Sequence, residues 1–188
     1  MLRNLFCIFI AGLWTVVLFP VTVVLMVATL NPSASLYVVQ RWWSPVLLWA
    51  GGATLHVTGK EHLKPGQPYI FVSNHQSTID IPAIFVALWP VDFRFVAKKV
   101  LQYVPFLGWY MTLAKFVFID RANHRKAVES LRLAGERIRG GVSVVMFAEG
   151  TRSVDSKVLP FKKGPFALAL QARVPVVPVA VEGSGVQM

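Results

Sequence analysis

Cysteine is nearly absent from this 188-residue chain, which contains only Cys7. A single cysteine excludes a disulfide within the chain and a cysteine-rich zinc site. The four histidines, His56, His62, His75 and His124, lack the close spacing of zinc ligands, which argues against a zinc hydrolase. We therefore expect neither a metal nor a cofactor.

Charged residues are also scarce, and acidic ones most of all. They make up 15% of the chain, with 19 Lys and Arg against 9 Asp and Glu, while 55% of the residues are hydrophobic. Soluble domains usually contain about 25% charged residues. The basic surplus favours anionic partners. Nucleic acid is disfavoured because the basic residues are dispersed and no RNA-binding signature is present, so this composition points to a membrane surface.

The N-terminal region has no charge between residues 4 and 40. Residues 5–30 exceed the about 20 helical residues that span a hydrocarbon core, although Pro20 is able to kink this helix. A second apolar stretch, residues 42–56, begins with two tryptophans, as is typical of the head-group layer. Two interpretations stay open: a spanning helix followed by an interfacial one, or a hairpin within one leaflet. A cleaved signal peptide is disfavoured, because the apolar run of a signal peptide is usually about 7–15 residues and this one is longer.

Basic residues are distributed unevenly around the first apolar segment. Only Arg3 precedes it, and all other Lys and Arg follow it. By the positive-inside bias we expect a membrane protein whose larger, C-terminal part faces the cytoplasm.

From residue 57 the pattern changes to short apolar runs that alternate with amphipathic segments. Buried strands are predicted at residues 69–73, 93–97, 116–119, 142–147 and 174–181. Helices are expected near residues 81–88, 98–110, 125–139 and 165–172. This alternation predicts a layered α/β fold with a mostly buried mixed sheet. We divide the chain into N-terminal membrane helices, residues 1–56, and an α/β domain, residues 57–188.

The sequence NHQSTID, residues 74–80, directly follows a predicted strand. On a regular helix His75 and Asp80 would point about 140° apart, so they meet only if the chain turns between them. Asp80 can then accept a hydrogen bond from one imidazole nitrogen and leave the other as a general base. This spacing is weak evidence by itself, because a structural histidine followed by an acid satisfies it as well.

Two more polar segments follow predicted strands: FIDR, residues 118–121, and FAEGTRS, residues 147–153. Ligands bind at the carboxyl edge of open parallel sheets. Arg121 and Arg152 are suited to hold a phosphate through paired donors, and Gly150 lets the backbone approach a ligand closely. For either arginine alone, a solvated surface position is the alternative.

Together these segments carry a family resemblance. NHQSTID matches the NHxxxxD motif of glycerolipid acyltransferases, KFVFIDR their GxIFIDR, FAEGTRS their FPEGTRS, and VPVVPV at residues 174–179 their VPVxPV. Over residues 59–181 the chain thus resembles 1-acylglycerol-3-phosphate acyltransferases of that family. It departs from the pattern at Lys115, where Gly is usual, and at Ala148, where Pro is usual.

The resemblance implies a role for each matched residue. His75 would be the catalytic base and Asp80 its orienting partner, with Arg121 and Arg152 at the phosphate of the acyl acceptor. The residues implied in binding the acceptor are Arg121, Glu149, Gly150, Thr151 and Arg152. Those expected to meet the acyl donor, the acceptor or the membrane are Lys115, Lys162 and Lys163.

The implied reaction moves a fatty acyl group from acyl-CoA or acyl-carrier protein to the sn-2 hydroxyl of lysophosphatidic acid, which gives phosphatidic acid in phospholipid synthesis. Glycerol-3-phosphate, another lysophospholipid or a lysolipid with an amino-acid head group is the alternative acceptor. A membrane-anchored lipid-binding module without catalysis is the alternative outside this enzyme class.

Overall fold

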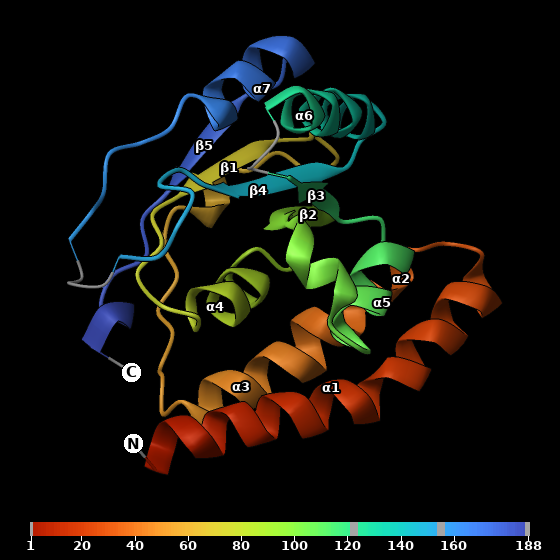
Figure 1. Cartoon of the computed structure of the whole chain (residues 1–188), viewed down its shortest axis with the longest axis vertical. Helices are drawn as coiled ribbons and strands as arrows, with labels where there is room; N and C mark the ends of the chain where they lie inside the picture. The colour runs from red at the N-terminus through yellow and green to blue at the C-terminus, as the bar shows by residue number, and fades with distance from the viewer. Residues whose placement is uncertain (1, 121–123, 154–156, 187–188) are drawn as a thin grey trace.

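The structure is a computed structural model, and it describes residues 2–120, 124–153 and 157–186. The chain begins with a helical hairpin (Figure 1). Its first arm is the 28-residue helix α1 (Leu2–Thr29), which is continuous through Pro20. The second arm consists of α2 (Ala34–Val38), η1 (Val39–Trp43) and α3 (Ser44–Ala50). Within the described part of the chain, only α1 is long and apolar enough to cross a membrane, and both interpretations of the hairpin stay open.

Five strands form one sheet in the order β3-β2-β4-β1-β5. They are β1 (Ile70–Ser73), β2 (Phe93–Lys98), β3 (Val117–Ile119), β4 (Ser143–Phe147) and β5 (Val176–Val179). All pairings between these described strands are parallel, whereas the sequence predicts a mixed sheet. The reason is that a helix lies in every connection between consecutive strands and returns the chain to the edge where the previous strand began.

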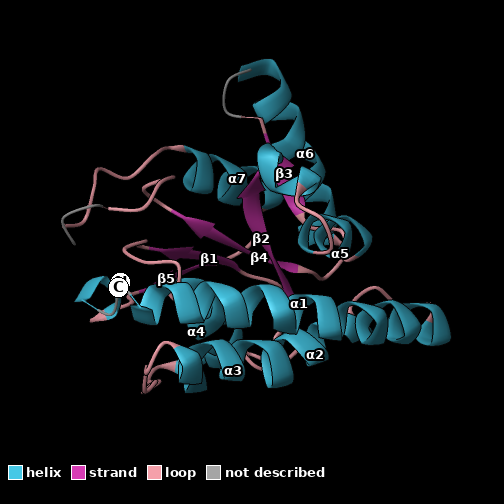
Figure 2. Cartoon of the chain, turned by 60° about the horizontal axis from the view of Figure 1, so that its bottom comes forward, coloured by secondary structure: helices cyan, strands magenta, loops and turns pink. Residues whose placement is uncertain are grey.

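The connecting helices cover both faces of the sheet. α4 (Asp80–Ala87), η3 (Lys99–Tyr103) and α5 (Leu107–Leu113) lie on one face. α6 (His124–Arg139) and α7 (Gly164–Ala172) lie on the other (Figures 1 and 2). The N-terminal hairpin packs outside α4 and α5, and the short turns η2 (Lys60–His62) and η4 (Ser184–Val186) complete the described elements. The expected layered α/β fold is therefore confirmed.

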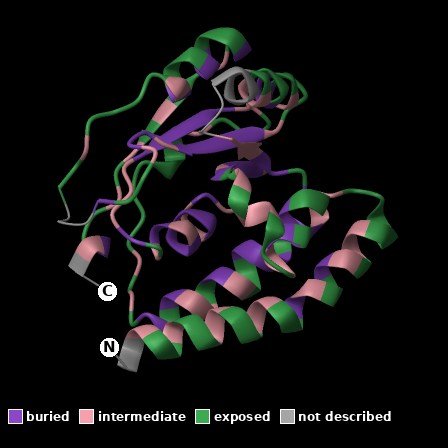
Figure 3. Ribbon diagram, viewed as in Figure 1, coloured by how far each residue is buried: buried purple, intermediate pink, exposed green. Residues whose placement is uncertain are grey.

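The core is built from the two faces of the central strands. Phe71 and Phe93 pack toward α4 and α5, while Ile70 and Val144 pack toward α6 and α7, and none of the four is more than 1% exposed. Figure 3 shows the central strands coloured as buried. Such continuous apolar strands are typical of parallel sheets covered on both sides. The edge strand β5 differs from its prediction as a buried strand, because Val176 is 39% exposed.

The helix predicted over residues 98–110 is broken in the structure. The short turn η3 is followed by Phe106 with a φ of +60°, and only then does α5 begin. Pro105 accounts for the break, since it lacks a backbone N–H and disfavours helical geometry in the residue before it.

A polar network fastens the hairpin to the sheet. Buried Arg94 donates to Asp92 Oδ1 at 2.5 Å and to the Ser33 hydroxyl at 2.9 Å, and Ser33 donates to Asp92 Oδ2 at 2.7 Å. Gln40 Nε2 donates to the Val91 carbonyl at 3.2 Å. These contacts keep the buried charge of Arg94 compensated and tie the hairpin to the α/β domain. The domain boundary at residue 56 stays a prediction.

Lys115 explains why glycine is usual at its position. Its φ is +60°, a left-handed conformation that strains residues with a Cβ but not glycine. We expect Lys115→Gly to raise the free energy of unfolding by about 0.5–1 kcal/mol, measured by urea unfolding in detergent. Lys60→Gly is the control, because Lys60 is an exposed lysine without a positive φ. If both glycine variants lose stability equally, the strain argument fails.

Candidate active site

The loops that follow β1 and β4 lie at the same carboxyl edge of the sheet, and we call the region between them the crevice. Strands β1 and β4 are neighbours, but α4 follows β1 on one face of the sheet and α7 follows β4 on the other. The two loops therefore diverge, which is where ligands bind in open α/β sheets. The loop after β1 carries His75, and the loop after β4 carries Glu149 and Arg152.

The predicted pairing of His75 with Asp80 is present in the structure. The chain turns after β1, and Asp80 is the first residue of α4, so His75 Nδ1 lies 2.8 Å from Asp80 Oδ2. The same carboxylate oxygen accepts the backbone N–H groups of Gln76 at 2.8 Å and Ser77 at 2.9 Å. The side chain of Asp80 is fully buried, whereas that of His75 is 12% exposed. The carboxylate is thus fixed, and the imidazole keeps an open side.

The pKa of the Asp80 carboxyl lies below its ordinary value. Burial acts in the opposite direction and raises this pKa, but hydrogen bonds from His75, from the Ser184 hydroxyl and from the backbone of Ser77 and Gln76 outweigh it. The Ser184 contact is a loose one, since neither Ser184 Oγ nor Asp80 Oδ1 has a partner of normal hydrogen-bond geometry among the described residues. Asp80 is therefore a carboxylate near neutral pH, and it accepts a hydrogen bond from Nδ1 of the His75 ring.

An aromatic neighbour fixes the plane of the imidazole. The rings of His75 and Phe147 are stacked with centroids 3.7 Å apart and an interplanar angle of 11°. Phe147 in turn stacks on Phe95 at 5.6 Å. With Nδ1 directed to Asp80, the Nε2 atom is left as the position that can take up a proton. Stacking and hydrogen bonding together fix the ring in an orientation that a general base would require.

The buried side chain of Glu149 connects the loop after β4 to the loop after β1. It is 1% exposed, and its Oε1 accepts the backbone N–H of His75 at 2.7 Å while its Oε2 accepts that of Leu159 at 2.8 Å. The Ser153 N–H donates to the His75 carbonyl at 3.0 Å. Both carboxylate oxygens are thus occupied by backbone donors, and the implied role of Glu149 in binding the acceptor stays a prediction.

Arg152 reaches across the crevice at its surface. Its Nη1 donates to the Thr78 hydroxyl at 2.6 Å, so it connects the loop after β4 to the one after β1. Gly150 precedes it with a φ of +71°, which bends the loop as the sequence analysis expects of a glycine there. Thr151 and Arg152 are exposed, so the guanidinium of Arg152 is open to an anionic ligand from the solvent.

Asn74 joins the end of β5 to the site, a contact that the sequence analysis missed. Its side-chain amide donates to the Val181 carbonyl at 2.9 Å, and its oxygen accepts the Val181 N–H at 2.8 Å. These two hydrogen bonds bring the residues after β5, including Ser184, against the loop that carries His75 and Asp80. The sequence alone does not show this contact, because it depends on the pairing of β1 with β5.

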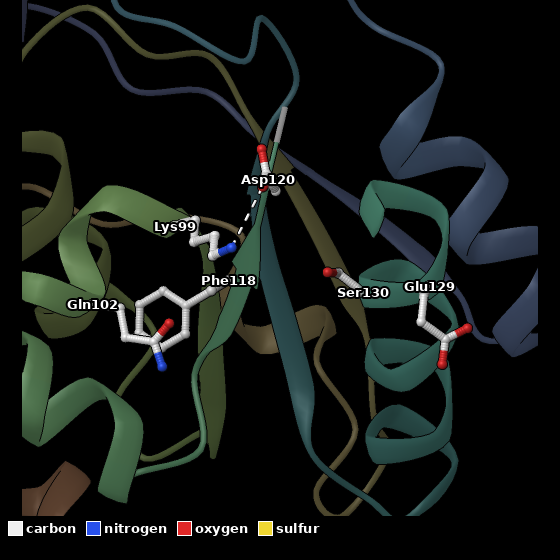
Figure 4. Close-up of a pocket in the computed structure, with 6 residues that line it drawn as sticks. All are labelled: Lys99, Gln102, Phe118, Asp120, Glu129 and Ser130. Carbon is white, nitrogen blue, oxygen red and sulfur yellow. Dashed lines mark hydrogen bonds and ion pairs between the residues drawn. The ribbon is translucent and has the colours of Figure 1, made fainter. Parts of the chain in front are cut away.

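Lys99 is a second residue that the sequence analysis missed. It follows β2 at the carboxyl edge, and its Nζ lies 3.5 Å from Asp120 Oδ2 after β3 (Figure 4). The two side chains line a cavity of about 290 Å³ together with Gln102 and Phe118. Its position directly after a buried strand was the available signal, because the same rule selected the other site residues. Arg121, the predicted phosphate ligand that follows Asp120, lies outside the described residues.

The predicted lysines lie at different ends of the sheet. Lys162 and Lys163 are exposed just before α7, which starts at the carboxyl edge. Lys115 precedes β3 and so lies at the opposite edge from the strand ends that carry His75 and Arg152. The structure thus separates Lys115 from the acceptor crevice, because parallel strands place their first and last residues on opposite sides. Contacts of these lysines with donor or membrane stay predictions.

Comparison with known proteins agrees with this geometry. The sequence model of the acyltransferase family matches residues 54–182, which include every strand and the whole crevice. The chain belongs to the acyltransferase family. It is 39% identical to a 1-acyl-sn-glycerol-3-phosphate acyltransferase of Saccharomyces cerevisiae, over 79% of this chain and 49% of the relative. It is 40% identical to an enzyme of the same name from Limnanthes alba, over 74% of this chain and 49% of the relative.

A solved structure of the acyltransferase family has the same fold. The crystal structure of the 1-acyl-sn-glycerophosphate (LPA) acyltransferase from Thermotoga maritima aligns with a TM-score of 0.81 and 29% identity, over 98% of this chain and 74% of that one. The chain spans about half the length of the curated relatives it matches. Since the alignment covers 98% of this chain, it includes the N-terminal hairpin together with the α/β domain.

Proposed function

We propose that this acyltransferase moves a fatty acyl group from an acyl thioester to the sn-2 hydroxyl of lysophosphatidic acid and so forms phosphatidic acid. The observation that carries the proposal is the contact of 2.8 Å between His75 Nδ1 and the buried carboxylate of Asp80. The names of the yeast, plant and Thermotoga relatives support the choice of acceptor.

In the proposed reaction the acyl group passes directly from the thioester to the acceptor, and His75 takes up and then returns one proton. His75 Nε2 takes the proton of the acceptor hydroxyl while that oxygen attacks the thioester carbonyl. The tetrahedral intermediate collapses, the carbon–sulfur bond breaks, and the departing thiolate takes the proton back from His75. Asp80 keeps the ring in the tautomer that leaves Nε2 free and stabilises the imidazolium that forms between the two steps. No cofactor beyond the acyl donor is needed.

Basic side chains at the carboxyl edge are suited to hold the acceptor phosphate. Arg152 follows β4, directly beside β1, and Lys99 follows β2, one strand further. With neighbouring strands about 4.8 Å apart, the ends of β4 and β2 lie about 5 and 10 Å from the end of β1, which carries the His75 loop. A bound phosphate positions the hydroxyl at the base, and such positioning supplies a large part of an enzyme's rate enhancement. Arg121 is predicted to join them.

Membrane anchoring by α1 fits both substrates. The most apolar 18-residue stretch of α1 is only 11% buried in the protein, so most of its apolar surface is free to contact lipid. Drawing an acyl chain from a bilayer into water would cost about 0.8 kcal/mol per CH₂. An enzyme held at the surface avoids that cost, and by the charge bias of the sequence the catalytic domain faces the cytoplasm.

An acyl-transfer assay on membranes that carry the chain tests this function. Labelled acyl-CoA is offered with lysophosphatidic acid, glycerol-3-phosphate, lysophosphatidylcholine or an amino-acid-headed lysolipid as the acceptor. We expect phosphatidic acid to form at least tenfold faster than any other product, because Arg152 and Lys99 select a terminal phosphate on a lipid. The same assay with acyl-carrier protein identifies the donor.

Two results would redirect the assignment. Faster acylation of glycerol-3-phosphate would move the chain to the first acylation step of glycerolipid synthesis. Product formation no faster than that of membranes carrying a His75→Ala variant, with every acceptor and both donors, would favour a non-catalytic lipid-binding module.

A further inference from the structure

A ridge of exposed apolar side chains lies on the catalytic domain itself, outside the active site. It consists of Val100 and Tyr103 on η3, Val104 after it, and Trp109 and Leu113 on α5, with exposed fractions of 63%, 71%, 39%, 50% and 48%. We call these five residues the α5 ridge. Exposed apolar side chains gathered on one surface mark sites of contact with a protein, a ligand or a membrane.

The α5 ridge is continuous with the apolar surface of α1. Phe19 of α1 contacts the rings of Phe106 and Trp109 edge-on, with centroids 5.5 and 6.0 Å apart. A hollow of about 560 Å³ between the two helices is lined by Phe19, Tyr103, Trp109 and Leu113 among others. Along α1 itself, Leu13, Val16 and Val17 are 49%, 44% and 46% exposed. One apolar face thus extends from the hairpin onto the catalytic domain.

The chemistry of the α5 ridge fits the border of a bilayer. Tryptophan and tyrosine concentrate where hydrocarbon meets the head groups, and the ridge contains one of each. The exposed Lys98 lies just before it at the end of β2, and a basic residue beside the head groups attracts anionic lipids. An interface with another protein would also tolerate this mixture. Continuity with α1, which alone among the described helices is long and apolar enough to cross a membrane, favours lipid.

We propose that the α5 ridge inserts into the head-group layer of a membrane that contains anionic lipids, on the same side as the exposed face of α1. The inference rests on the proposed membrane-bound function and adds a second, independent lipid contact, made by the catalytic domain. η3 starts where β2 ends, at the carboxyl edge that carries the His75 loop. Docking of the ridge therefore brings the mouth of the crevice to the lipid surface, where a lysolipid enters with its phosphate foremost.

Single-cysteine labelling tests the placement of the α5 ridge. The chain has one cysteine, so a Cys7→Ala background accepts a unique new one. Tyr103→Cys reports on the ridge, with Leu113→Cys as a second position. Phe9→Cys, at a 63% exposed site, reports on α1, and Leu170→Cys, at an 81% exposed apolar site of α7 on the other face of the sheet, is the matched control. Each carries an environment-sensitive fluorophore in the whole 188-residue chain, reconstituted in phosphatidylcholine vesicles with or without phosphatidylglycerol.

We expect the labels at residues 103, 113 and 9 to be quenched by spin-labelled lipid and to be several-fold less accessible to iodide than the label at residue 170. Quenching of the labels at residues 103 and 113 by spin-labelled lipid should weaken when phosphatidylglycerol is left out, whereas quenching of the label at residue 9 should not.

The outcomes distinguish this inference from the proposed function. If the label at residue 9 meets lipid while those at 103 and 113 resemble the control, the ridge is not a membrane contact but α1 remains one. If all labels are open to iodide, the membrane anchoring by α1 fails as well. Labels at 103 and 113 that are shielded from both quenchers would mean that protein covers the ridge, which overturns the inference.

Discussion

Replacing His75 with alanine is expected to lower kcat for acyl transfer by about 10²–10⁴-fold, the usual contribution of a general base. The variant removes the atom that takes the acceptor's proton but leaves the crevice in place, because Asp80 is still held by the N–H groups of Gln76 and Ser77. The lost ring stacking on Phe147 costs about 0.5–1.5 kcal/mol, too little to unfold the domain. The assay is initial-rate kinetics with lysophosphatidic acid and acyl-CoA, alongside thermal unfolding in detergent.

Two matched variants sharpen this test. Asp80→Asn keeps the shape but loses the charge that orients the ring, so it should lower kcat as well with little change in the KM of either substrate. His62→Ala removes a histidine whose side chain is 82% exposed in η2, and it should leave kcat unchanged. A His75→Ala enzyme that keeps kcat within tenfold of the parent would refute the assignment of His75 as the base.

The elements of this fold are largely predictable from apolar runs and turn residues, but their arrangement is not. All five strands and three of the four helices of the α/β domain lie where the periodicity predicts them. The insertion of β4 between β2 and β1 is not encoded in any local pattern, because every strand reads as a similar buried run. Pro105 was the one local signal that the prediction of a helix over residues 98–110 ignored.

The candidate site is predictable where a side chain follows a strand. That rule selects His75, Glu149 and Arg152, because parallel strands end at the same edge of the sheet. It does not reveal which direction a side chain takes from the strand end. Glu149 turns inward to backbone donors, whereas a sequence pattern presents it as one more polar residue beside a ligand. Direction depends on partners that come from loops about ten residues or a whole strand away.

Replacing Glu149 with glutamine is expected to lower both stability and turnover, although the carboxylate is shielded from the acceptor. Its two oxygens accept one backbone N–H each, from His75 and Leu159. A glutamine can replace only one of these acceptors, and its amide nitrogen would then face the other N–H. An unsatisfied buried donor costs about 1–3 kcal/mol, so the free energy of unfolding should fall by that amount.

Turnover should fall because Glu149 sets the position of the residue that acts as the base. A displacement of the base by about 1 Å can cost on the order of 10²-fold in rate, and we expect kcat to drop by about 10–100-fold. The KM for lysophosphatidic acid should change little. Arg152→Ala is the contrasting variant, since Arg152 is exposed at the crevice and should raise that KM without loss of stability.

The pair of variants decides between two roles for the same motif. If Glu149 contacts the acceptor, as the family resemblance implies, Glu149→Gln behaves like Arg152→Ala: the KM rises and urea unfolding is unchanged. If it positions the loop of His75, stability and kcat fall together and the KM stays. The second outcome is the one that a carboxylate with 1% exposure and two backbone donors requires.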